Sequence, residues 1–215
     1  MKVAKKSLKD KIPEMIAYWE NKEFLDEESQ DYLNSAKEAL KNNELSNAYN
    51  WLGSIYFVAK DFDKSEMLFE QVGHYAEKED NPIAYAISLI NLGELHTEKG
   101  EVLDAELNFV FCQQFLEGLN VPSLEWLLLR DFAELYVRNG MIDLAESFVN
   151  KIIKKNKENQ KYTWESIPQW LEALLAMVPD KHQLEVKNFI TKVSNKIDKQ
   201  VVRKSKKGKR KLYAS

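Results

Sequence analysis

The chain has 215 residues, of which 44% are hydrophobic and 30% charged, and this composition excludes wholesale disorder. Seven glycines and five prolines are too few for a turn-rich β architecture, and the formal net charge is only −3. No apolar run approaches the roughly 18 residues of a membrane span, and no apolar signal-peptide core follows the N-terminal lysines, so we expect a cytoplasmic protein.

Proline, glycine and apolar spacing predict an all-α chain of ten helices arranged as five successive pairs. In chain order, the helices are expected over about 12–24 and 27–42, 45–60 and 62–79, 82–99 and 101–117, 122–139 and 141–158, and 162–178 and 180–202. The division that follows is a basic segment at 1–9, N-terminal capping helices at 10–44, three repeats at 45–160, a degenerate C-terminal capping repeat at 161–202, and a basic tail at 203–215.

The helix ends carry local signals. Pro82 stands where a first-turn proline is tolerated, and Asn81 before it is the expected N-cap. Gly100 is expected to end that helix in a left-handed conformation. The short connections between helices predict antiparallel hairpins.

The three middle pairs share a 40-residue period, which predicts an α-solenoid of antiparallel helix hairpins. The recurring residues are small, aromatic or acidic, and they stand at Gly53, Gly93 and Ala133; Tyr56, His96 and Tyr136; Ser65, Ala105 and Ala145; Glu66, Glu106 and Glu146; and Phe69, Phe109 and Val149. Because helices approach closely only where side chains are small, we expect the glycine column to face the Ser65 column. The aromatic residues are expected to fill the gaps between successive hairpins.

The same columns resemble the tetratricopeptide repeat, whose pattern is matched best by Leu92-Gly93, His96, Gly100, Ala105 and Phe109. The match covers about residues 45–158. The period of 40 exceeds the family's usual 34, and the proline that often closes a repeat stands at the start of the next unit instead. The resemblance implies a right-handed superhelix that binds a peptide or partner protein in a groove lined by the first helix of each hairpin.

Carried onto this chain, that groove gives a set of candidate binding residues on the first helices of the three hairpins. They are Asn50, Trp51, Ser54, Asn91, Glu94, Arg130, Asp131 and Glu134. Asn50 and Asn91 are expected to clamp a peptide backbone, since an amide side chain both donates and accepts hydrogen bonds. The alternative is that these are simply solvated polar positions. The carboxylate clamp of the chaperone-binding members is not matched.

Catalytic and metal-binding patterns are not found, so we expect neither an enzyme nor a cofactor. The three histidines, His74, His96 and His182, have no metal-ligand spacing. His96 replaces a packing tyrosine and is expected to be a hydrogen-bonded interior residue. The recurring glutamates are expected to form interhelical salt bridges or a solvated stripe. The single cysteine, Cys112, is expected to be a small buried residue.

The C-terminal end of the chain is strongly basic. Residues 199–215 hold eight of the 31 basic residues and none of the 34 acidic ones, so residues 1–198 carry 23 basic and 34 acidic residues, a net charge of −11. The tail is expected to be disordered in isolation. The candidate contacts to an anionic surface are Arg203, Lys204, Lys206, Lys207, Lys209, Arg210 and Lys211.

Three functions follow as hypotheses. The first is a non-catalytic scaffold or adaptor that binds a partner protein or peptide in its groove. The second is a nucleic-acid-associated factor whose tail contacts RNA or DNA phosphates. The third is a regulatory repeat protein that senses a peptide. For the tail, an anionic membrane, the chain's own acidic body and a nuclear localisation signal stay open, as does the oligomeric state.

Overall fold

The structure is a computed structural model that describes the backbone of residues 8–159 and 166–212. All regular secondary structure in those two ranges is helical. The chain divides into two compact units, Met1–Glu125 and Trp126–Ser215, which are described separately. Residues 1–7 of the expected basic segment, residues 160–165 and residues 213–215 lie outside the described ranges.

Over its described residues, 8–125, the first unit contains six helices and the start of a seventh. They are α1 (Leu8–Glu20), α2 (Glu27–Lys41), α3 (Leu45–Val58), α4 (Phe62–Lys78), α5 (Pro82–Lys99), α6 (Val102–Leu116) and the first residues of α7 (Pro122–Arg138). The bounds of α2 to α6 agree with the predicted ones to within two residues. Helix α1 begins and ends four residues earlier than predicted, so that Pro13 lies inside the helix.

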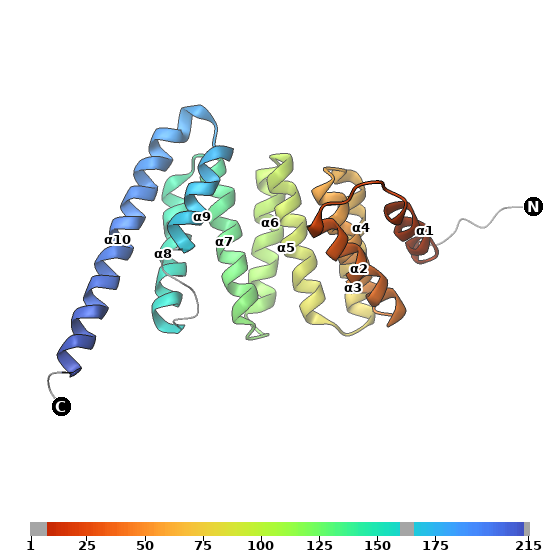
Figure 1. The fold of residues 1–215 in the computed structure, drawn as a ribbon, viewed down its shortest axis with the longest axis horizontal. Helices are drawn as coiled ribbons and strands as arrows, with labels where there is room; N and C mark the ends of the chain where they lie inside the picture. Colours follow the sequence, from red (N-terminus) through yellow and green to blue (C-terminus); the bar gives the residue numbers. More distant parts are fainter. Residues whose placement is uncertain (1–7, 160–165, 213–215) are drawn as a thin grey trace, which may run out of the picture. The chain divides into compact units, whose positions relative to one another are not determined.

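Each helix of the first unit packs against its neighbour in the sequence, from α2 on α3 to α5 on α6 (Figure 1). Helix α1 contacts both α2 and α3. Its buried face carries Ile12, Ile16 and Trp19, and the Trp19 ring meets the Tyr56 ring edge-on at 5.1 Å between centroids. The N-terminal pair therefore packs against α3, and its role as a capping unit stays a prediction.

The small residues hold the two helices of a hairpin together. The Ser65 hydroxyl donates to the carbonyl of Gly53 at 2.9 Å, so the two small-residue columns do face each other. A Cβ on Gly53 would lie 2.6 Å from the Phe69 ring, and one on Gly93 would lie 2.2 Å from the Phe109 ring. These two rings thus fill space within a hairpin, whereas the sequence analysis placed them between hairpins.

Caps fix where the helices of this unit begin and end. Asn81 Oδ1 accepts a hydrogen bond from the amide of Ala84 at 3.1 Å, and Gly100 ends α5 with a φ of 77°, both as predicted. Helix α3 begins differently, because the Glu79 carboxylate just after α4 accepts from the amide of Leu45 at 2.8 Å and from the hydroxyl of Ser46 at 2.5 Å. The start of α3 is therefore capped by a residue 34 positions later.

The second unit contains the rest of α7, then α8 (Ile142–Asn159), α9 (Ser166–Leu174), the short 3-10 helix η1 (Leu175–Met177) and α10 (Asp180–Leu212). Rings of α7 and α8 stack, with the Phe132 and Phe148 centroids 4.5 Å apart. Helix α10 packs against α8, α9 and η1. Its buried residues are Val186, Phe189, Ile190, Val193 and Ile197.

Helix α10 extends beyond the predicted end near residue 202. Its backbone stays helical through Leu212, across most of the segment that the sequence describes as a tail. The disorder expected of that segment in isolation stays a prediction. None of the described helices combines the length and apolar character that crossing a bilayer requires.

Candidate partner-binding surface and polar cluster

Two predicted groove residues from successive hairpins are bonded to each other. Asn91 Nδ2 on α5 donates to Asn50 Oδ1 on α3 at 2.6 Å, and both side chains are half-buried. This bond uses one donor and one acceptor of the pair. The Asn50 amide nitrogen can then donate a second hydrogen bond, and the Asn91 amide oxygen can accept one. An extended peptide backbone offers the matching carbonyl and N–H groups.

An aromatic pair joins α2 and α3. Trp51, next to Asn50 on α3, stacks on Tyr32 of α2, with ring centroids 5.7 Å apart. The Tyr32 hydroxyl donates to Glu28 at 2.6 Å. The pKa of Tyr32 is raised to about 12, first by burial and then by Glu28, and the negative charge of Glu94 on α5 adds to the effect. Residues of α2, α3 and α5 therefore share one acidic, aromatic surface.

Ser54 contributes less than the sequence predicts. Its hydroxyl donates to the carbonyl of Asn50 at 3.0 Å, one turn back in the same helix. That bond commits the hydroxyl proton to the backbone of α3. The Ser54 hydroxyl is therefore bonded within its own helix, and its contact with a partner stays a prediction.

The other three predicted groove residues belong to the second unit. Asp131 is buried, with 3% of its side chain exposed, and its Oδ1 lies 3.2 Å from Arg130 Nη2. The low exposure places this carboxylate in the protein interior, and the contact of Asp131 with a partner stays a prediction. Glu134 forms an ion pair with Arg138 one turn later, at 2.7 Å. Both ion pairs join residues of the same helix, α7.

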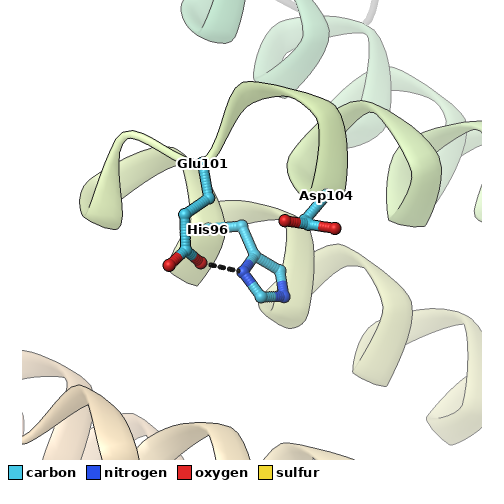
Figure 2. A group of neighbouring side chains, drawn as sticks. All are labelled: His96, Glu101 and Asp104. Atoms are coloured by element: carbon cyan, nitrogen blue, oxygen red, sulfur yellow. Dashed lines mark hydrogen bonds and ion pairs between the residues drawn. The ribbon is translucent and has the colours of Figure 1, made fainter.

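A polar cluster lies where α5 turns into α6. His96 Nδ1 is 2.7 Å from Glu101 Oε2, and one ligand atom each of His96, Glu101 and Asp104 lie within 4.8 Å of one another. Figure 2 shows the Glu101 carboxylate turned toward the His96 ring, with Asp104 approaching from another side. The hydrogen bond expected of His96 is therefore confirmed. The residue is also largely buried, with 12% of its side chain exposed.

This cluster already contains a cation from the protein itself. Lys99 Nζ lies 3.0 Å from Glu101 Oε2 and 3.0 Å from Glu66 Oε2 on α4. The pKa of Lys99 is raised by its bonds to Glu101 and Glu66, and the pKa of Glu101 is lowered by its bonds to His96 and Lys99. The Lys99 ammonium therefore lies between the carboxylates of Glu66 and Glu101 and links α4, α5 and the start of α6.

The glutamate column forms salt bridges between helices, as the sequence analysis allows. Glu66 on α4 pairs with Lys99 on α5, and Glu146 on α8 pairs with Lys192 on α10 at 2.7 Å. Cys112 is buried, as expected, and its thiol lies 3.5 Å from the carbonyl of Ala86. These residues have structural roles.

The structure also exposes an apolar stripe that the sequence analysis missed. Leu103, Leu107, Phe111 and Phe115 follow one another along α6 at intervals of four residues, and Leu103 is 80% exposed. A comparison of the repeats could have found it. The equivalent positions of the preceding copy are partly polar, with Asp63, Met67, Gln71 and Tyr75. Only α6 carries large apolar residues at all four positions.

Comparisons of this chain with family models, with curated proteins and with solved structures find no match. The assignment of a function therefore depends on the arrangement of the residues described above.

Proposed function

We propose that this chain is a non-catalytic adaptor of tetratricopeptide-like build, which binds an extended segment of a partner protein across α3 and α5. The observation that carries the proposal is the hydrogen bond between Asn50 and Asn91. It holds two amide side chains from successive hairpins side by side. One peptide backbone can then donate to Asn91 and accept from Asn50 without either side chain being reoriented.

The surroundings of the pair favour a particular kind of segment. The stacked rings of Tyr32 and Trp51 offer an apolar surface for one large side chain of the ligand. Glu28 and Glu94 lie near Tyr32 and make this surface negative. We therefore expect a segment with an aromatic or aliphatic residue next to a lysine or arginine, and we expect acidic segments to be rejected.

The test is a selection of peptides on the full chain from a random displayed library, followed by affinity measurements on the selected peptides. The variant Asn50→Ala/Asn91→Ala is expected to bind them about 5- to 100-fold more weakly, because two neutral hydrogen bonds contribute about 1–3 kcal/mol together. Asn34→Ala/Asn108→Ala, which removes two asparagines from α2 and α6, is the matched control. A library that yields no binder, or binders that the two double variants hold equally well, would overturn the proposal.

A further inference from the structure

A second surface, in the other unit, has the opposite charge. A groove of about 570 Å³ lies between α8 and α10, and three of its lining residues are Lys192, Lys196 and Lys199. Lys192 pairs with Glu146 at 2.7 Å, and Lys196 donates to Asn150 of α8. These contacts to α8 hold two of the three ammonium groups along the groove.

Neutral polar groups lie between the lysines. Asn188, Thr191 and Asn195 line the same groove. The Thr191 hydroxyl donates to the carbonyl of Lys187 at 2.9 Å, so its proton is committed to the helix backbone. The amides of Asn188 and Asn195 are the neutral donors that this wall of the groove can offer to a ligand.

The lysines of the groove begin a longer row of basic positions. From Lys192 the next members are Lys196, Lys199, Arg203, Lys206 and Arg210, at steps of four, three, four, three and four residues. Such steps keep positions on one face of a helix, and the backbone of α10 is helical through Leu212. With a rise of 1.5 Å per residue, the row extends over about 27 Å. After Asp198 it meets no acidic residue.

We propose that this groove and row of basic positions bind the phosphodiester backbone of a nucleic acid. Lysine and arginine, together with asparagine amides, are the groups that proteins use for phosphate and sugar contacts. A regular row of cations without an apolar centre matches the polar, positively charged character of protein–nucleic acid interfaces. Interfaces between proteins are instead organised around buried aromatic or aliphatic residues.

The burial of α10 argues against a bilayer as the ligand. A helix that lies in a membrane surface inserts an apolar face beside its basic residues. In α10 the apolar residues Val186, Phe189, Val193 and Ile197 are already buried in the second unit. The phosphate contacts of a nucleic acid require no such face.

Glu146 allows a test in which the binding of nucleic acid becomes tighter instead of weaker. Its carboxylate lies in the groove and engages Lys192. A phosphate in the groove would compete with that carboxylate and be repelled by it. Glu146→Gln is therefore expected to tighten binding of nucleic acid by severalfold, because Lys192 is released and the repulsion is removed.

The test measures binding of the full chain to a labelled 20-base-pair duplex of mixed sequence, made once as DNA and once as RNA, between 50 and 300 mM NaCl. The variant Lys192→Gln/Lys196→Gln/Lys199→Gln is expected to lose at least tenfold in affinity at 100 mM salt. On DNA, the slope of log K against log salt is expected to become shallower by about 2.7, which corresponds to three lost phosphate contacts.

Two further variants separate a built site from a general effect of charge. Lys41→Gln/Lys154→Gln/Lys187→Gln removes the same charge from exposed lysines elsewhere and is expected to leave the slope nearly unchanged. Asn188→Ala/Asn195→Ala keeps the net charge and is expected to weaken binding severalfold without a change of slope. Circular dichroism and thermal unfolding check that each variant is folded.

Three outcomes would overturn the proposal. In the first, neither duplex binds. In the second, the two triple lysine variants lose the same affinity and slope, so that the tail acts through net charge alone. In the third, polyglutamate or vesicles rich in phosphatidylserine displace the duplex at equal charge concentration, so that the true ligand is an acidic protein or a membrane. Because these residues are separate from Asn50 and Asn91, failure here leaves the adaptor proposal standing.

Discussion

At the scale of single residues, the hairpins depend on glycines that admit a neighbouring ring. Gly93 and Phe109 show this most clearly, because Phe109 is fully buried and cannot turn toward solvent. Glycine in a helix interior costs about 1 kcal/mol relative to alanine. Its presence at position 93 is explained by the 2.2 Å that would separate an added Cβ from the ring.

Gly93→Ala is accordingly expected to lower the free energy of unfolding by about 1–3 kcal/mol, in spite of the better helix propensity of alanine. Urea denaturation of the variant and the unmodified chain measures the difference. Gly118→Ala is the control, because a Cβ at Gly118 meets nothing within 4 Å. Equal stability of the two variants would show that the Phe109 ring can move aside.

At the scale of elements, the turn between α5 and α6 is fixed by charge as well as by Gly100. His96 and Lys99 at the end of α5 both contact Glu101, which stands just before α6. The lowered pKa of Glu101 means that its ionised form is favoured in the folded chain. Its stabilising effect is therefore fully present above the ordinary value of 4.5 and is lost as the pH falls through the lower folded value.

We expect Glu101→Gln to unfold at a lower urea concentration than the unmodified chain at pH 7, and the difference to shrink as the pH falls below about 4.5. Denaturation midpoints at a series of pH values from 7 to 3 measure this trend. Glu23→Gln, at an exposed position between α1 and α2, provides a control of equal charge. A difference that grows as the pH falls would contradict a lowered pKa of Glu101 in the folded chain.

The helices could be predicted from the sequence because their signals are local. Pro82 and Gly100 mark the ends of α5 directly, and the 40-residue period repeats that pattern in the neighbouring hairpins. The bounds of α1 were predicted less well, because the helix begins at Leu8, four residues before the predicted start near residue 12. Where the local signal is ambiguous, tertiary packing decides the boundary.

Contacts between distant residues were less predictable. The Asn50–Asn91 bond joins residues 41 positions apart, and only their shared helix face was evident beforehand. The burial of Asp131 depends on the packing of α7, which the repeat pattern does not specify. Lys192 and Lys196 were missed because they precede Asp198, where the uninterrupted basic run begins, whereas their helical spacing continues to Lys199 and beyond.

At the scale of the whole molecule, acidic and basic residues are unevenly distributed along the sequence. A net charge of −3 combines −11 over residues 1–198 with +8 over residues 199–215. A chain with that average would ordinarily be repelled by a polyanion. Charges more than about 10 Å apart are largely screened at 0.1 M salt, so distant acidic residues would repel a polyanion at the basic end only weakly.

The full chain is therefore expected to be retained on heparin at pH 7.5 and low salt, and to elute as NaCl is raised. A chain ending at Asp198 is expected to pass through the same column, since its net charge is −11. A variant of full length with glutamine at every basic position from 203 to 211 controls for chain length. Retention of the shortened chain would show that basic residues of the body suffice.

The Glu79 cap on α3 has a consequence for the order in which this hairpin opens. The amides of Leu45 and Ser46 depend on a carboxylate that stands one residue beyond the end of α4. Fraying at the end of α4 therefore deprives the first turn of α3 of its acceptors in the same event. The two ends should exchange their amide hydrogens at a common rate, so that this corner of the protein opens as one kinetic unit.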